Sequence, residues 1–271
     1  MRCAFAAAVT GLAVLASNPA RADPRVVSLD QCADQFVLAL APRDEIVAVS
    51  KRALNDDSNQ RALAVGLPEH RASLEAILAV RPTLAVRYWT ADAGLPDALR
   101  RRGVGVVQLD EASEFAGVRA NVRKVAAALG RPAAGEALIG RMDAKLAKSR
   151  GAWGGARALY LTPYGFTAGR GTLVGAMMAA AGLDAAASGP SYEPAPLEAL
   201  VLRPPAALVL GFFRDLAGGR QHWTIAGNDY LQGLMRRRTI ASLPGSVLGC
   251  PAWYAADGAL TLAEAHPGAG R

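Results

Sequence analysis

Cysteine, histidine and aromatic residues are scarce in this chain of 271 residues, which has three cysteines, three histidines and 6% aromatic residues. Three cysteines are too few for a disulfide-rich scaffold. The net charge is +7, but no block of Lys and Arg is longer than Arg236–Arg238, so nucleic-acid binding is not indicated. Hydrophobic residues make up 52% and charged residues 20%, which is typical of a globular chain with one large domain or two modest ones.

Motifs for covalent or metal-assisted catalysis are also missing. The sequence contains no Gly-x-Ser-x-Gly, His-Glu-x-x-His or Cys-x-x-Cys. His70 and His222 fall in polar segments expected to be loops, and His266 lies in the tail, so a convergent set of metal ligands is not expected. The adjacent Asp56 and Asp57 indicate a polar turn rather than a hard-cation loop. We therefore expect a protein that is not an enzyme and has neither a metal site nor a resident cofactor.

The first 22 residues have the organisation of a secretory signal peptide. Arg2 precedes an uncharged apolar run at residues 4–16, and Ala20-Arg21-Ala22 is a small-x-small cleavage site. The run is shorter than the roughly 20 residues that a membrane-spanning helix requires. We expect cleavage after Ala22 and export of a soluble product.

Export affects the interpretation of the two cysteines that remain. Cys32 and Cys250 form an even pair in an oxidising compartment, where a disulfide can persist. The sequence is equally compatible with a disulfide, which would tie the two ends of the chain together, and with two buried thiols.

Short apolar strands alternate with helices through the first half of the chain. The periodicity predicts strands at residues 25–29, 45–50, 83–88 and 104–109, and helices at 31–41, 73–80 and 95–102. Ser73 suits a helix N-cap and Gly103 a helix stop. This alternation of helices and continuously apolar strands predicts a parallel sheet covered on both faces.

The second half repeats the first after a helical interruption. Residues 113–129 and 132–149 predict two successive helices, and strands resume at 157–162. Residues 74–82 (LEAILAVRP) and 197–205 (LEALVLRPP) agree at four of nine positions, and each precedes an apolar strand. We therefore predict two related α/β lobes with parallel sheets, at 23–131 and 153–271, joined by a long rigid linker helix at 132–152. Ligands of such sheets bind near the carboxyl ends of the strands.

Aromatic and arginine side chains follow the ends of several predicted strands. A large flat ligand in the cleft would cover these aromatic residues, although some of them are expected to pad loops onto the core. Arg87, Arg170 and Arg214 suit carboxylate or phosphate groups. The glycine-rich residues 165–172 either make a tight turn, which is favoured, or hold an anion at a helix start. The candidate ligand-binding residues are Asp30, Gln31, Arg87, Tyr88, Trp89, Tyr164, Phe166, Arg170, Tyr192, Phe212, Phe213, Arg214, Trp253 and Tyr254.

Three segments carry a resemblance to a known family. Residues 25–50 (RVVSLDQCADQFVLALAPRDEIVAVS) resemble the opening of periplasmic solute-binding proteins for metal chelates, which include the cobalamin and ferric-siderophore receptors of ABC importers. Residues 73–86 and 196–211 resemble the helix, proline and strand elements of that family's two lobes. The resemblance extends from residue 25 to about 265 and implies Rossmann-like lobes of the class III architecture with small closure on binding. Asp30-Gln31-Cys32 departs from the more Ser/Pro-rich family opening and leaves the ligand open.

The resemblance also implies partners. In that family a surface glutamate on each lobe docks onto arginines of the permease, and the matching positions are Glu75 and Glu198. A monomer in the periplasm that binds a small metal chelate is expected. A corrinoid such as cobalamin is the first choice and a ferric siderophore the second. Haem is the third, with Tyr88, Tyr164, Tyr192 and Tyr254 as possible axial ligands. Two alternatives stay open, namely an exported enzyme acting on an acidic small molecule and a carrier or sensor without a transporter.

Overall fold

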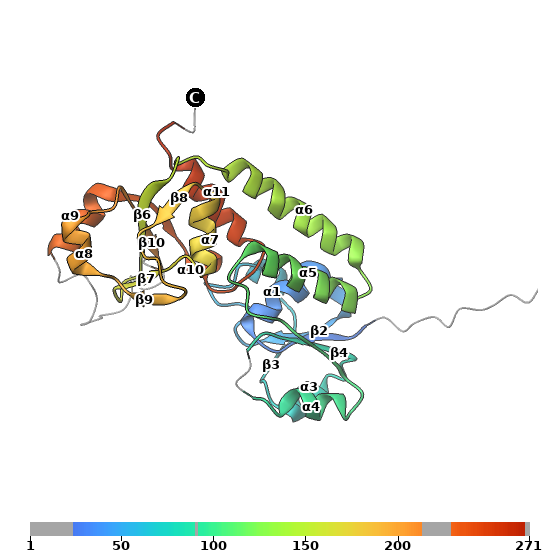
Figure 1. Cartoon of the computed structure of the whole chain (residues 1–271). Helices are drawn as coiled ribbons and strands as arrows, with labels where there is room; N and C mark the ends of the chain where they lie inside the picture. The colour runs from blue at the N-terminus through green and yellow to red at the C-terminus, as the bar shows by residue number, and fades with distance from the viewer. Residues whose placement is uncertain (1–23, 90–91, 213–228, 269–271) are drawn as a thin grey trace, which may run out of the picture.

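Two α/β lobes make up the structure, a computed structural model that describes residues 24–89, 92–212 and 229–268 (Figure 1). Each lobe is built on a parallel sheet, as the strand–helix alternation predicted. Within the described residues, no helix is both long enough and apolar enough to cross a membrane.

The N-terminal lobe contains a five-stranded sheet in the order β3-β2-β1-β4-β5, with all neighbours parallel. Its central strand is fully buried, with Val26 and Val27 both 0% exposed, which explains why the strand is continuously apolar. The strands are β1 (Val26–Ser28), β2 (Ile46–Ser50), β3 (Glu69–His70), β4 (Leu84–Arg87) and β5 (Gly105–Gln108). The helices are α1 (Gln31–Leu40), the 3₁₀ helix η1 (Arg43–Glu45), α2 (Arg61–Ala64), α3 (Leu74–Ala79) and α4 (Leu95–Arg100).

The C-terminal lobe contains a four-stranded parallel sheet in the order β11-β10-β6-β8, with a two-stranded antiparallel ribbon formed by β7 and β9. Residues 183–185 form the edge strand β8 of this sheet. The strands are β6 (Ala156–Leu161), β7 (Phe166–Ala168), β8 (Leu183–Ala185), β9 (Tyr192–Pro194), β10 (Ala207–Gly211) and β11 (Thr239–Leu243). The helices are α7 (Leu173–Ala180), α8 (Leu197–Leu202), α9 (Asp229–Arg238), α10 (Gly245–Leu248) and α11 (Ala255–Glu264).

A pair of helices connects the lobes. α5 (Phe115–Ala128) belongs to the N-terminal lobe, and α6 (Pro132–Ser149) runs from it to the first strand of the C-terminal lobe (Figure 1). The two helices approach closely at Gly135, where an added Cβ would lie 2.6 Å from the Cβ of Ala126. At the far end of α6, Lys145 forms an ion pair with Asp257 of α11. α6 therefore contacts both lobes.

The cores of the two lobes are continuous behind the cleft. The ring of Phe36 in α1 packs edge-on against Trp253 of the C-terminal lobe, with the ring centroids 5.4 Å apart. Beside this contact Cys32 and Cys250 form a disulfide, with a Cα–Cα distance of 5.3 Å. Helix α1 is thereby joined to the C-terminal lobe by an apolar contact and by a covalent bond.

A buried carboxyl group connects α1 to the strands beneath it. Asp34 is 0% exposed and accepts hydrogen bonds from the Ser28 hydroxyl, from the Ser50 amide at 2.9 Å and from the Ser50 hydroxyl at 2.5 Å. Burial raises the pKa of Asp34 to about 6, although these hydrogen bonds act in the opposite direction. Asp34 therefore fixes the position of α1 on β1 and β2.

Candidate ligand-binding site

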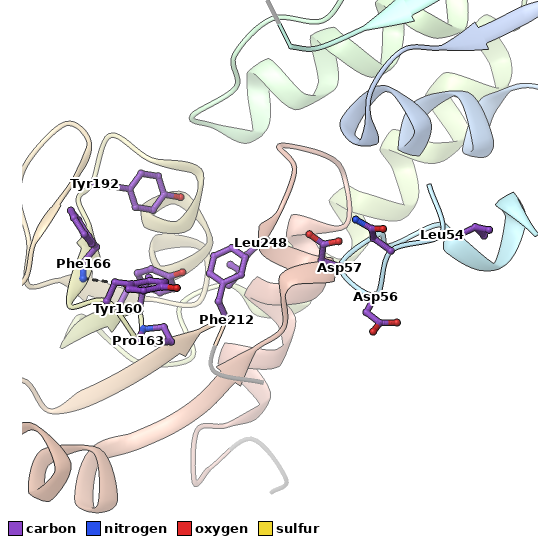
Figure 2. A pocket seen from close by; sticks show the side chains of 12 residues that line it. Leu54, Asp56, Asp57, Tyr160, Pro163, Phe166, Tyr192, Phe212 and Leu248 are labelled. Atoms are coloured by element: carbon purple, nitrogen blue, oxygen red, sulfur yellow. Dashed lines mark hydrogen bonds between the residues drawn. The ribbon is translucent and has the colours of Figure 1, made fainter. Parts of the chain in front are cut away.

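A cavity of about 1180 Å³, which we call the main cavity, lies between the lobes at the carboxyl ends of the strands (Figure 2). The C-terminal lobe contributes residues that follow β6 and β10 and residues of β7, β9 and α10, whereas the N-terminal lobe contributes the turn after β2. Its lining comprises Leu54, Asn55, Asp56, Asp57, Tyr160, Thr162, Pro163, Tyr164, Phe166, Tyr192, Phe212 and Leu248.

Aromatic rings form the wall on the side of the C-terminal lobe. Tyr164, Phe166 and Tyr192 are 50%, 46% and 52% exposed, so apolar ring surface faces the cavity without cover. The sequence predicted these three residues and Phe212 as ligand-binding, and the structure places all four around this one cavity. This wall of the cavity therefore offers aromatic ring faces to a large flat molecule.

The end of β10 is shaped by a close approach to this wall. An added Cβ on Gly211 would lie 2.0 Å from the hydroxyl oxygen of Tyr160, so only glycine fits against that ring. Phe212 follows with a φ of +62°, a conformation that is uncommon for any residue other than glycine. This strained conformation accompanies the placement of the Phe212 ring in the cavity wall.

The opposite wall is a polar turn that the sequence analysis did not assign to the ligand. Leu54, Asp56 and Asp57 line it (Figure 2), and Asn55 belongs to the same lining. Asp56 is paired with Arg61, and Asp57 lies 3.8 Å from Arg52. Within the described residues, no group of three or more His, Cys, Asp or Glu side chains is placed to hold a metal ion. The signal that could have identified this turn was its position after a parallel strand.

A second cavity of about 400 Å³ lies beside the first, and Tyr192 and Leu248 line both. Tyr88 and Trp89 reach it from the end of β4, with their rings in an edge-on contact at 6.0 Å. The Tyr88 hydroxyl donates a hydrogen bond to Glu111. Burial and then the Glu111 carboxylate raise the pKa of Tyr88 well above its usual value, so this phenol is protonated at neutral pH.

Asp30, Arg87 and Arg170, three of the predicted ligand-binding residues, have side chains that are engaged in hydrogen bonds within the protein. Asp30 caps α1 by accepting from the amides of residues 32 and 33, and its second oxygen accepts from those of Tyr88 and Trp89. The guanidinium of Arg87 is buried and donates to the carbonyls of Trp89 and Asp92. Arg170 bonds to Asp184 at 2.6 Å and does not line the main cavity.

The glycines around Arg170 favour the tight-turn interpretation. An added Cβ would lie 2.0 Å from the Gly189 carbonyl oxygen at Gly169, and 2.4 Å from that of Pro190 at Gly171. The segment therefore needs glycine because the 189–190 backbone passes against it.

Trp253 and Tyr254 do not contribute to the cavity, contrary to the prediction. They are 7% and 3% exposed and pack in the core between the lobes. Tyr88, Trp89, Phe212 and Trp253 therefore do not share one hollow. Tyr88 and Trp89 line the second cavity, Phe212 lines the main one, and Trp253 lines neither.

The remaining predicted residues fall in three groups. Glu75 and Glu198 are exposed in the first turns of α3 and α8. His70 belongs to β3 and is buried rather than in a loop, and the ring of His266 packs on Trp153 at 4.9 Å. Phe213, Arg214 and His222 lie outside the described residues.

Comparison with known proteins identifies the class. A family model described as periplasmic binding protein matches residues 26–244, so the chain belongs to the periplasmic binding protein family. Members of this family are binding proteins, and the chain is a substrate-binding protein rather than an enzyme. The predicted family, the two-lobe fold and the absence of an enzymatic role are thereby confirmed.

Individual relatives are distant. A cobalamin-binding protein of Halobacterium salinarum is 28% identical over 234 residues, which cover 83% of this chain and 62% of that protein. The periplasmic heme-binding protein RhuT from Roseiflexus sp. RS-1 is 25% identical with a TM-score of 0.68 and covers 92% of this chain and 100% of that one. The vitamin B12-binding protein BtuF of Vibrio cholerae is 17% identical with a TM-score of 0.63, covers 92% and 98%, and supports the fold alone.

Proposed function

We propose that the chain is the substrate-binding component of an ABC importer, and that it captures a corrinoid such as cobalamin in the cleft and delivers it to the membrane permease. The observation that carries this proposal is the main cavity of about 1180 Å³ with its aromatic wall. This volume exceeds the roughly 300–1,000 Å³ of pockets for ordinary small ligands. A corrin macrocycle is large and fairly flat, so its faces suit the half-exposed rings of Tyr164, Phe166 and Tyr192.

The charge of the lining favours a corrinoid over more anionic chelates. Among the described residues that line the main cavity, the charged side chains are Asp56 and Asp57, both acidic. The corrin edge carries neutral amides, which can donate to Asn55 and to these carboxylates. An anionic ferric siderophore would instead place negative charge against them. The cobalamin-binding relative supports the same choice.

Haem is the second candidate, because phenol groups stand in the cavity wall. Tyr164 and Tyr192 are half-exposed and line the main cavity, where either oxygen could approach an iron. Tyr88 is bonded to Glu111, and Tyr254 is buried in the core, so neither is as accessible. The solved structure of RhuT supports this candidate.

Spectroscopy and calorimetry with purified protein test the ligand. Protein isolated from its native host is expected to show corrinoid bands, whereas haem and ferric siderophores absorb differently. Added cyanocobalamin at 100 times its dissociation constant is expected to stabilise the fold by about 2.7 kcal/mol. No binding of cyanocobalamin, together with saturable binding of haem, would refute the corrinoid assignment.

Delivery and export are tested separately. Glu75 and Glu198 are exposed on different lobes, and we expect Glu75→Ala/Glu198→Ala to abolish uptake with unchanged ligand affinity. Uptake equal to that of the wild type would favour a carrier without a transporter, whereas chemical conversion of the ligand would favour an enzyme. The proposed signal peptide predicts that the exported protein begins at Asp23, which N-terminal sequencing checks.

A further inference from the structure

A third hollow, which we call the N-lobe groove, crosses the N-terminal lobe at the carboxyl ends of β1, β2, β3 and β4. Its volume is about 530 Å³, and Leu29, Ser50, His70 and Trp89 are among its lining residues. Trp89 also lines the second cavity, so the groove adjoins the cleft between the lobes. Groups bound in the groove and in the main cavity could therefore belong to one large ligand.

The rim of the N-lobe groove is basic. Lys51, Arg52 and Arg71 line it, and all three are exposed. Arg52 lies 3.8 Å from Asp57, but within the described part of the chain neither Lys51 nor Arg71 forms an ion pair. Asp30 also lines the groove, and its oxygens already accept four backbone amides. Two cationic groups are thus available to a ligand.

A buried histidine also lines the groove. His70 is 6% exposed, with Nδ1 2.8 Å from the carbonyl oxygen of Arg71 and Nε2 2.7 Å from that of Ser28. Both ring nitrogens therefore face backbone carbonyl oxygens, which holds the ring in place at the edge of the groove.

An amide side chain also lines the groove. Gln31 lines the groove, and its carboxamide forms no hydrogen bond with the described residues. Its side-chain oxygen and nitrogen are not among the buried polar atoms that lack a partner, so the amide is open to the groove. An amide in this position can donate to an acceptor that occupies the groove.

We infer that the N-lobe groove binds an anionic substituent of the ligand, a phosphate or a carboxylate, through Lys51, Arg71 and the Gln31 carboxamide. The identity of the occupant rests on the proposed function. For a corrinoid such as cobalamin it is the phosphodiester of the nucleotide loop, whereas for haem it is a propionate. The groove thereby takes the role that the sequence analysis gave to Arg87 and Arg170, whose guanidinium groups are engaged elsewhere.

Paired ligands with and without the anion test this inference. Cobinamide has the corrin ring of cobalamin but lacks the nucleotide loop and its phosphate. In Lys51→Ala/Arg71→Ala, calorimetry is expected to show cobalamin binding weakened about 10- to 100-fold, the range for charge-assisted hydrogen bonds, and cobinamide binding unchanged. Haem and its dimethyl ester make the corresponding pair for a carboxylate.

The matched control is Arg101→Ala/Arg102→Ala, which removes the same charge from exposed residues ahead of β5, at the opposite edge of the sheet. This control is expected to bind every ligand as the wild type does. Equal losses of affinity for cobalamin and cobinamide in Lys51→Ala/Arg71→Ala, or no loss for either, would contradict anion binding in the N-lobe groove. If the wild type binds neither corrinoid, the proposed ligand fails instead. In that case, haem with its dimethyl ester and inorganic pyrophosphate test whether the groove binds an anion. If Lys51→Ala/Arg71→Ala weakens the binding of neither haem nor pyrophosphate, the inference is wrong.

Discussion

Replacing Asp34 by Asn is expected to change how the stability of the protein depends on pH. The carboxyl group is completely buried, and its pKa rises from 3.8 in the unfolded chain to about 6 in the folded one. The folded state therefore binds this proton more tightly than the unfolded chain does. The protonated carboxyl group contributes to the free energy of unfolding at low pH, and this contribution is lost as the pH rises from about 4 to 6. At about 1.4 kcal/mol for each pH unit, the loss is about 3 kcal/mol.

Asparagine suits this site because its hydrogen bonds can be retained. Its side-chain oxygen can accept from the Ser28 hydroxyl and the Ser50 amide, and its amide can donate to the Ser50 hydroxyl. Urea unfolding of both proteins at pH 4, 5, 6 and 7.5 measures the effect, and other titrating groups cancel in the difference. Relative to the wild type, Asp34→Asn should gain about 2 kcal/mol between pH 4 and 7.5, because the unfolded wild-type carboxyl group is already more than half ionised at pH 4. A constant difference, or one that falls with pH, would show that Asp34 does not titrate as described.

Three further variants test the disulfide, the main cavity and the core between the lobes. Cys32→Ser/Cys250→Ser removes a disulfide between residues 218 positions apart. Urea unfolding is expected to show a loss of up to about 5 kcal/mol in the free energy of unfolding, and a negligible change would contradict a stabilising role for the disulfide. Tyr164→Ala/Phe166→Ala is expected to reduce the free energy of ligand binding, measured by calorimetry, by about 2 kcal/mol. The free energy of unfolding should be nearly unchanged, because both rings are half-exposed. Unaltered affinity would exclude the aromatic wall as the binding site. Trp253→Ala should lose about 3–5 kcal/mol of stability while the folded variant binds ligand normally, and selective loss of binding would return Trp253 to the site.

The sheets of both lobes were largely predictable because parallel strands buried on both faces are continuously apolar. The predicted strand at 83–88 corresponds to Leu84–Arg87, and the one at 157–162 to Ala156–Leu161. Edge elements were missed for the opposite reason. β3 consists of Glu69 and His70, and two polar residues carry no apolar pattern.

The candidate site was predictable in position but not in side-chain direction. A sequence places Arg87 at the end of a strand, but it does not show that the guanidinium turns back onto the carbonyls of its own loop. Trp253 was misassigned because its burial depends on Phe36, which is 217 positions away and comes from the other lobe. The turn at Asn55–Asp57 became part of the site only through the placement of the lobes.

The continuous core and the disulfide behind the cleft have a consequence for transport kinetics. A scaffold joined by Phe36, Trp253 and the Cys32–Cys250 bond resists large changes in the spacing of α3 and α8. On the proposed docking through Glu75 and Glu198, empty and loaded molecules would then present nearly the same face to the permease. Unloaded receptor would compete for the transporter, so overproducing it while cargo is scarce should slow uptake rather than accelerate it.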